Sequence, residues 1–270
     1  MEIVDETPFR TMHVDHLRVE VYPSRRAMGL AAARRVAQQL RTTLATKPRA
    51  SVVFASAPSQ SEFLSALIDE PGVDWQRVIA FHMDEYTGLA VDAPQGFGRF
   101  LRDHLFSKVT PGVVHYLDGN AADLRGETDR YSALLRAYPP DIVCGGIGEN
   151  GHLAFNDPPV ADFNDPLMVK AVDLVMESRE QQVHDECFER LQDVPMRALT
   201  LTIPALVSAA HFSCVVPSRT KAEAVRDMLF GPISTACPAS VLRRHPGAVL
   251  YLDPESASIV GAVDPREPSR

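Results

Sequence analysis

The sequence has few of the features that mark secreted, membrane-spanning or metal-dependent proteins. Among its 270 residues are four cysteines, which are scattered without a CxxC pair and are expected to be reduced. No run approaches the roughly 20 apolar residues that a membrane helix needs. The opening residues, MEIVDE, are acidic and lack the apolar stretch of a signal peptide. These absences predict a cytoplasmic protein with no membrane partner, which needs neither disulfides nor a metal to fold.

An excess of positive charge is also absent. The formal net charge is −8, whereas surfaces that bind nucleic acids or anionic membranes need clustered lysine and arginine. We therefore expect no nucleic-acid partner. A small anionic substrate is not excluded, because it needs only one or two local cations. No metal site is predicted either, since His13 and His16 form an isolated pair in the N-terminal arm.

What the sequence does contain is a regular alternation of strand-like and helix-like segments. Short apolar stretches, such as 51–55, 77–82 and 141–144, alternate with segments in which apolar residues recur every three to four positions. This alternation predicts an α/β fold with a doubly wound, mainly parallel, Rossmann-like sheet and helices on both faces. We expect an N-terminal arm without regular structure over residues 1–16, a single domain over 17–255 and a frayed C-terminal tail over 256–270.

The most informative segment is a glycine-rich run at residues 145–159, GGIGENGHLAFNDPP, directly after one of these apolar stretches. Four glycines within seven residues let the backbone approach a ligand closely. Ligands of open parallel sheets bind at the carboxyl ends of the strands, where this run places Asn150, His152 and Asp157. The run is not a dinucleotide fingerprint, because no acidic residue ends a following strand, and no cofactor is predicted. The proline- and aspartate-rich segment 159–166 is expected to form a flap over the site.

A second polar segment makes the first more specific. The apolar stretch 77–82 runs directly into MDEYTGL, which places Asp84 and Glu85 in the loop after a strand. Together the two segments resemble the glucosamine-6-phosphate deaminase (isomerase) family, which is related to the 6-phosphogluconolactonases, over about Val21 to Leu252. The resemblance implies an aldose–ketose isomerase-deaminase that converts an amino-sugar 6-phosphate, glucosamine 6-phosphate first among them, and water into a ketose 6-phosphate and ammonia. It implies no metal and no organic cofactor.

The resemblance also implies roles for four catalytic residues. Asp84 matches the general base that moves a proton between C2 and C1 of the opened sugar, and His152 matches the histidine that opens the ring. Asn150 and Asp157 stand where many members have aspartate and glutamate. Both are expected to orient the imidazole, although Asn150 has no charge and Asp157 is one methylene shorter. The structural alternatives are an aspartate that caps a turn and a histidine on an ordinary loop.

The phosphate site follows the family pattern less closely. Residues 56–61, SAPSQS, replace a glycine-rich loop, and Lys221 matches the phosphate-binding lysine. The family's second cation, a phosphate-binding arginine, is expected near Asp185 or Glu186. Arg179 matches an earlier arginine of that stretch, and His184 is left as a substitute. An ordinary serine-capped helix and a solvated lysine are the alternatives. The expected substrate-binding residues are Ser56, Ser59, Gln60, Ser61, Glu85, Gly151 and Lys221. For Glu85 two roles stay open, a contact with a sugar hydroxyl or the orientation of its loop.

Two other functions stay open at this point. A sugar-phosphate lactonase on the same fold needs a histidine that protonates the leaving oxygen but no base for a C–H bond. A sugar-phosphate sensor without catalytic activity would account for the altered phosphate loop. The segment 81–89 and the Ala-Phe-Asn run favour the deaminase. In each case the partner is a small sugar phosphate, and formation of a homo-oligomer stays open.

Overall fold

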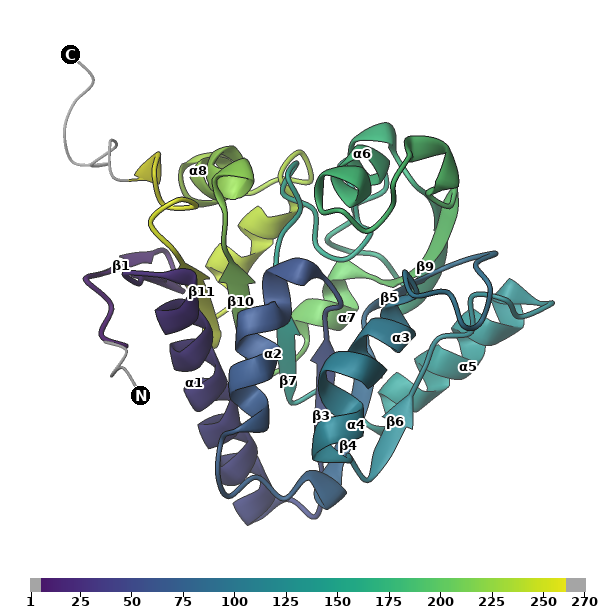
Figure 1. The fold of residues 1–270 in the computed structure, drawn as a ribbon, viewed down its shortest axis with the longest axis horizontal. Helices are drawn as coiled ribbons and strands as arrows, with labels where there is room; N and C mark the ends of the chain where they lie inside the picture. Colours follow the sequence, from purple (N-terminus) through teal and green to yellow (C-terminus); the bar gives the residue numbers. More distant parts are fainter. Residues whose placement is uncertain (1–5, 261–270) are drawn as a thin grey trace.

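The computed structural model describes residues 6–260 and contains a large, mainly parallel sheet with helices packed against it (Figure 1). The sheet has the strand order β1-β2-β11-β10-β7-β3-β4-β6, and every neighbouring pair is parallel except β1 with β2. This confirms the predicted doubly wound, mainly parallel fold. The strands are β1 (Arg10–Val14), β2 (Leu17–Val21), β3 (Ala50–Phe54), β4 (Val78–His82), β6 (Val113–His115), β7 (Ile142–Gly145), β10 (His211–Val216) and β11 (Ala248–Leu252).

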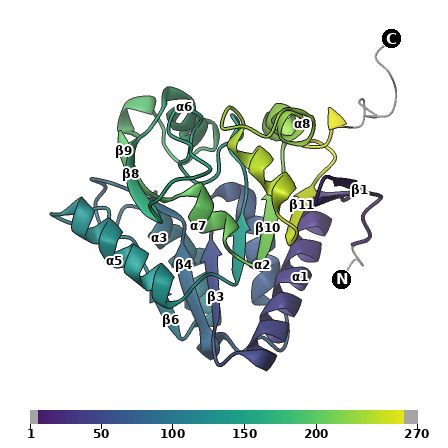
Figure 2. The same cartoon turned by 180° about the vertical axis from the view of Figure 1, so that it is seen from behind.

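Helices cover both faces of this sheet because successive strand residues point to opposite sides. In β3, for example, Val52 packs in the hydrophobic cluster of α1 and α2, whereas Val53 packs in the cluster of α5, α7 and α8. Figures 1 and 2 show these two sets of helices from opposite sides. The helices are α1 (Arg25–Thr46), α2 (Ser61–Ile68), α3 (Phe97–Leu101), α4 (Ser107–Val109), α5 (Leu124–Ala137), α6 (Met176–His184), α7 (Ile203–Val207) and α8 (Ala222–Phe230). None of the helices in residues 6–260 is long and apolar enough to cross a membrane.

A second sheet was not predicted from the sequence. It consists of β5 (Asp84–Tyr86), β9 (Arg197–Leu201) and β8 (Val169–Asp173), all antiparallel, in the order β5-β9-β8. Only Met83 separates β4 from β5, so the chain passes from one sheet directly into the other. The expected loop position of Asp84 is therefore wrong, because Asp84 pairs with Thr200 of β9.

Both ends of the described chain are more ordered than expected. The expected arm without regular structure contains β1, which pairs with β2 along its whole length. The expected frayed tail is packed as far as Val260, since Ser256 and Val260 are fully buried. Ser256 also donates its backbone N–H to the Asp253 carboxylate at 2.8 Å. Parts of the predicted arm and tail, residues 1–5 and 261–270, lie outside the described residues.

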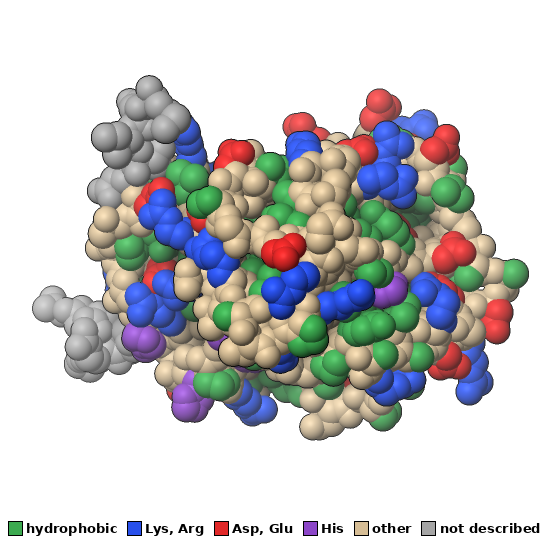
Figure 3. Space-filling model, turned by 90° about the horizontal axis from the view of Figure 1, so that it is seen from below, with side chains coloured by type: hydrophobic (Ala, Val, Ile, Leu, Met, Phe, Trp, Pro, Cys, Tyr) green, Lys and Arg blue, Asp and Glu red, His purple; other side chains and the backbone are tan. Residues whose placement is uncertain are grey.

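The two ends of the large sheet differ in character. Figure 3 shows the molecule from below, where the parallel strands begin, and on this face basic, acidic and hydrophobic side chains are intermingled. At the opposite end, where the strands finish, α6 and α8 rise above the sheet (Figure 1). The glycine-rich run and the Asp84 segment both lie at that second end.

Candidate active site

A pocket opens where β3, β4 and β7 end, which is the expected place for a ligand in a parallel sheet. The segments after these three strands line it together with residues of α3 and of α6. The residues are Ala55–Gln60 after β3, Met83 and Asp84 after β4, Gly146–Gly148, His152, Ala154 and Phe155 after β7, Phe97 from α3, and Gln181, Gln182 and Asp185 at α6. The fold therefore brings Asp84, His152 and the 56–61 segment to one cavity.

Asp84 is only 8% exposed at the pocket wall. Burial raises the pKa of this carboxyl well above its ordinary value, and the neighbouring Glu85 carboxylate raises it further. Pairing between β5 and β9 fixes the backbone that carries it. Asp84 is thus a rigidly held carboxyl with increased affinity for a proton, which is the property that a general base for a weakly acidic C–H bond needs.

The glycine-rich turn leaves room for the His152 ring. A Cβ atom on Gly148 would lie 2.2–2.4 Å from atoms of the imidazole, so no larger residue fits there without moving the ring. Gly151 has a φ of +78°, and a Cβ on it would lie 2.6 Å from the Cys237 Sγ. Both glycines are needed for the turn and for the place of the imidazole against it. Gly151 itself does not line the pocket.

The His152 ring is held by a buried carboxylate. Its Nδ1 lies 3.0 Å from the Asp157 Oδ1, which also accepts a hydrogen bond from the Asn150 side-chain amide at 2.9 Å. Burial opposes the charge of Asp157, but the hydrogen bonds and charge of its neighbours, His152 first, lower the pKa of this carboxyl below its usual value. The Asn150 amide oxygen accepts the His152 backbone N–H at 3.1 Å. Asn150 therefore supports Asp157 and the turn rather than the ring itself.

Ser178 completes this cluster and was not predicted. Its hydroxyl donates to the Asp157 Oδ1 at 2.6 Å and lies 3.0 Å from the His152 Nδ1. Ser178 belongs to α6, a helix that the search for apolar periodicity missed. The side of α6 that faces the site carries a polar stripe at positions i, i+3, i+4 and i+7. These residues are Ser178, Gln181, Gln182 and Asp185. A search for polar residues with helical spacing would have indicated it.

The segment after β3 forms a short 3-10 turn, Pro58–Gln60, followed by α2. The Ser56 Oγ is buried and has no hydrogen-bond partner among the described residues, and Ser59 lines the pocket beside it. Gln60 instead turns its amide to the Val215 carbonyl, at 3.1 Å. Ser61 does not line the pocket, and Glu62 is paired with Arg25 at 2.9 Å. Hydroxyl donors from this segment therefore reach the pocket, and the Glu62 charge is compensated elsewhere.

Lys221 lies in the 3-10 turn after β10 and is 4% exposed. Within the described part of the chain its Nζ has no hydrogen-bond partner. Burial lowers the pKa of Lys221, while the carboxylates of Asp185 and Glu149 act in the opposite direction. A buried ammonium without a hydrogen bond is costly, so it marks a place that an anionic group would stabilise. Lys221 itself is not among the residues that line the pocket.

The other candidate cations point elsewhere. His184 is largely exposed, with its ring 3.3 Å from the Glu149 carboxylate. Arg179 is buried and donates to the carbonyls of Leu191 and Val194 at 2.7 and 3.2 Å. The substitution of His184 for the expected arginine is therefore not supported by its position. Asp185 lines the pocket where a cation was expected.

Glu85 also lies outside this pocket, although a substrate contact was expected for it. Adjacent residues of a strand point to opposite sides, so Asp84 faces the cavity and Glu85 faces α3. The Glu85 carboxylate accepts backbone N–H groups of Phe97 and Gly98 at 3.0 and 2.8 Å.

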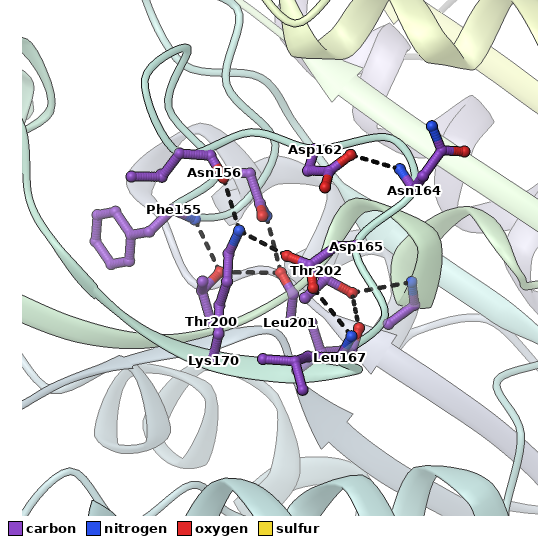
Figure 4. Close-up of polar contacts among 12 residues, drawn as sticks. Phe155, Asn156, Asp162, Asn164, Asp165, Leu167, Lys170, Thr200, Leu201 and Thr202 are labelled. Atoms are coloured by element: carbon purple, nitrogen blue, oxygen red, sulfur yellow. Dashed lines mark hydrogen bonds and ion pairs between the residues drawn. The ribbon is translucent and has the colours of Figure 1, made fainter. Parts of the chain in front are cut away.

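The expected flap is instead fixed to the second sheet. Figure 4 shows Lys170 of β8 reaching back to the Asp165 carboxylate, which lies at 2.9 Å. The Lys170 ammonium also donates to the Val160 carbonyl at 2.7 Å. The Thr202 hydroxyl donates to the Leu167 carbonyl at 2.7 Å (Figure 4). Residues 159–166 do not line the pocket.

No group of three or more histidine, cysteine, aspartate or glutamate residues within 6–260 could hold a metal ion.

Residues 23–251 match the family model of glucosamine-6-phosphate isomerases/6-phosphogluconolactonase. The chain belongs to this family. A glucosamine-6-phosphate deaminase of Exiguobacterium sibiricum is 39% identical over 188 residues, which cover 70% of this chain and 73% of the relative. A second glucosamine-6-phosphate deaminase, from Listeria innocua, is 35% identical over 202 residues, which cover 75% of this chain and 84% of the relative.

Solved structures of the family have the same fold. A monomeric glucosamine-6-phosphate deaminase superimposes with a TM-score of 0.82 at 30% identity, covering 89% of this chain and 99% of that one. A 6-phosphogluconolactonase from Shewanella baltica superimposes with a TM-score of 0.72 at 17% identity, covering 87% and 96%. The second likeness concerns the fold alone.

Proposed function

We propose that this family member is an aldose–ketose isomerase-deaminase that converts an amino-sugar 6-phosphate, most readily glucosamine 6-phosphate, and water into a ketose 6-phosphate and ammonia. The observation that carries the proposal is the buried Asp84 carboxyl in one pocket with the hydrogen-bonded His152 ring. A carboxylate with a raised proton affinity suits the removal of a proton from carbon, a step that lactone hydrolysis lacks. The names of the relatives at 39% and 35% identity support the same reaction.

His152 opens the sugar ring in this proposal. Because the Nδ1 of the imidazole contacts Asp157 and Ser178, the Nε2 is left for the substrate. The imidazole moves a proton between the ring oxygen and O1 of the sugar. The Asp157 charge stabilises the imidazolium that forms. Asn150 holds Asp157 in place through the hydrogen bond at 2.9 Å.

Asp84 then acts on the open chain. The carboxylate removes the proton from C2, which produces an enolamine, and a proton delivered to C1 converts it into a ketimine. Water adds to C2 of the ketimine, and ammonia leaves as the C2 carbonyl of the ketose forms. The burial of Asp84 favours the first step, because it destabilises the charged base relative to the protonated acid.

The phosphate is placed at the end of the pocket formed by the 56–61 segment and the last turn of α6. Lys221 supplies the cation, and the Ser56 and Ser59 hydroxyls donate hydrogen bonds. The unsatisfied Lys221 Nζ and Ser56 Oγ support this placement, since both are buried polar groups without partners in the described chain.

Turnover of glucosamine 6-phosphate in D₂O tests the proposal. We expect ammonia release together with deuterium on C1 of the ketose product, because proton transfer through Asp84 exchanges with solvent. The parallel assay is hydrolysis of 6-phosphogluconolactone. Hydrolysis of the lactone without ammonia release from any amino-sugar phosphate would overturn the proposal in favour of a lactonase. Binding of sugar phosphates without product would indicate a sensor.

A further inference from the structure

Glu85 connects β5, the strand that carries Asp84, to the start of α3, from which Phe97 lines the pocket. Its Oε1 accepts the backbone N–H groups of Tyr86 and Phe97, both at 3.0 Å, and its Oε2 accepts that of Gly98 at 2.8 Å. Phe97 and Gly98 begin α3, where backbone N–H groups have no partner within the helix. Glu85 therefore serves as the acceptor for the first turn of α3 from a position on β5.

This connection determines the place of a pocket wall. Phe97 lines the pocket together with Asp84, and its ring packs 4.6 Å from that of Tyr86 and 5.8 Å from that of Phe155. The contact at Gly98 is close, because a Cβ there would lie 3.3 Å from the Glu85 Oε2 and 2.9 Å from the Tyr116 ring. The backbone of α3 is thus held tightly against β5, and Phe97 cannot shift while the Glu85 contacts persist.

Glu85 also brings a negative charge next to the candidate base. Burial is the first cause of the raised pKa of Asp84, and Glu85 is the charged group that adds to it. Burial also raises the pKa of Glu85 itself, while its three backbone hydrogen bonds act in the opposite direction and favour the carboxylate. The other titratable groups around Asp84 differ in this respect. Burial lowers the pKa of His82 to about 3 and raises the pKa values of Tyr86 and Tyr131, so these three side chains are neutral near pH 7. His152 and Asp185 face Asp84 across the pocket.

We propose that Glu85 is a positioning residue for the reaction, which ties β5 to the first turn of α3 and places its carboxylate beside Asp84. This inference rests on the proposed deaminase function. It assigns Glu85 two separable effects. The three hydrogen bonds hold Asp84 and Phe97 at the correct separation, and the charge makes Asp84 a stronger base.

Two substitutions separate the effects. Glu85→Gln removes the charge and keeps one of the two acceptor oxygens at full side-chain length, whereas Glu85→Asp keeps the charge and both oxygens but retreats by one methylene from α3. Glu189→Gln is the matched control, because Glu189 is exposed and lies outside the pocket. Rates of ammonia release from glucosamine 6-phosphate are measured from pH 4 to 9 for all four proteins. Thermal unfolding of each variant confirms that it is folded.

The active base is the deprotonated carboxylate, so kcat/KM falls as the pH drops through the Asp84 pKa. In Glu85→Gln we expect this acid limb at lower pH than in the wild type, because the repulsion that raised the Asp84 pKa is gone. In Glu85→Asp we expect an acid limb close to the wild type with kcat lowered about 10- to 100-fold, as for an approximately 1 Å misplacement. The Glu189→Gln profile should equal the wild type.

An acid limb that coincides in wild type and Glu85→Gln would overturn the charge effect, and wild-type kcat in Glu85→Asp would overturn the positioning effect. The phosphate of the substrate titrates equally in all four proteins, so it does not contribute to the differences. Failure of the underlying function is recognised separately, because the wild type would then release no ammonia at any pH.

Discussion

The two ends of the pocket are built differently. At the His152 end, one carboxylate oxygen of Asp157 lies within hydrogen-bond distance of the imidazole and of the Asn150 and Ser178 side chains. At the opposite end acidic Asp185 lines the pocket, and Lys221, which is not itself a lining residue, has a buried ammonium with no hydrogen-bond partner in the described chain. The first end is preorganised without a ligand, whereas the second lacks a partner that an anion would supply. Substitutions near His152 should therefore change kcat, whereas substitutions near Lys221 should change KM.

Removal of the base should give the largest effect. Asp84→Asn keeps the size of the side chain and abolishes its ability to take a proton, so we expect kcat to fall about 10²- to 10⁴-fold. Binding of substrate, measured by calorimetry with the inactive variant, should stay within a few-fold of the wild-type KM. Asp129→Asn, at an exposed position on α5, is the control. A variant that keeps more than half of the wild-type kcat would exclude Asp84 as the base.

Removal of the buried Lys221 cation should raise KM and leave kcat nearly unchanged. Lys221→Ala should raise KM for the phosphorylated substrate about 10- to 100-fold, since hydrogen bonds to charged groups contribute about 1.5–3 kcal/mol. The effect on kcat should be much smaller, because the contact exists equally in the ground state and the transition state. Lys108→Ala, at an exposed position on α4, should leave both parameters unchanged. An unchanged KM in Lys221→Ala would place the phosphate elsewhere.

Loss of the Ser178 hydroxyl should weaken the preorganised end moderately. Ser178→Ala removes one donor from the Asp157 Oδ1, which keeps its contacts with Asn150 and His152. Because the carboxylate stays partnered, we expect the loss of an ordinary hydrogen bond, about 0.5–1.5 kcal/mol, or a factor of about 2 to 13. We expect this loss in kcat with little change in KM, which steady-state kinetics resolves. Ser65→Ala on the exposed side of α2 is the control. A change confined to KM would mean that Ser178 contacts the substrate and not the histidine cluster.

The smallest effect should be a gain. Asp185→Asn removes a negative charge from the anion end, so KM for glucosamine 6-phosphate should fall about two- to fivefold. Competitive inhibition by glucosamine without phosphate provides the comparison and should be unaffected. The gain should shrink at high salt, because a partly exposed charge is screened. A KM that rises on this substitution would show that Asp185 binds the substrate directly.

The sequence predicts the large sheet well and the small one poorly. Short, continuous apolar stretches predict strands that are buried on both faces, as β3 and β4 are. The strand β5 has three residues, two of them acidic, and forms only because β9 pairs with it from more than 100 positions away. Local sequence contains no signal for such a partner.

The candidate site shows the same division. The positions of Asp84, His152 and Asp157 follow from motifs at strand ends, and the structure places Asp84 and His152 in one pocket with Asp157 behind the ring. The direction of Glu85 depends on β5 being a strand, and the contribution of Ser178 depends on α6. Neither element has the apolar periodicity by which helices and strands are recognised. Arg179 illustrates the converse, because a charged residue that matches a motif is occupied by backbone carbonyls.

The helix α6 spans the distance between the two ends of the pocket. Ser178 and Asp185 are seven residues apart on one side of it, which corresponds to about 10 Å along the axis. Because Ser178 is hydrogen-bonded to the His152 cluster, the last turn of α6 lies at a set distance from that cluster. A sugar too short to reach the last turn cannot contact both ends of the pocket at once. Truncation of the substrate should therefore reduce the rate of ring opening as well as affinity. The length of α6 would in this way select substrates whose distal group lies about 10 Å from the group that His152 acts on.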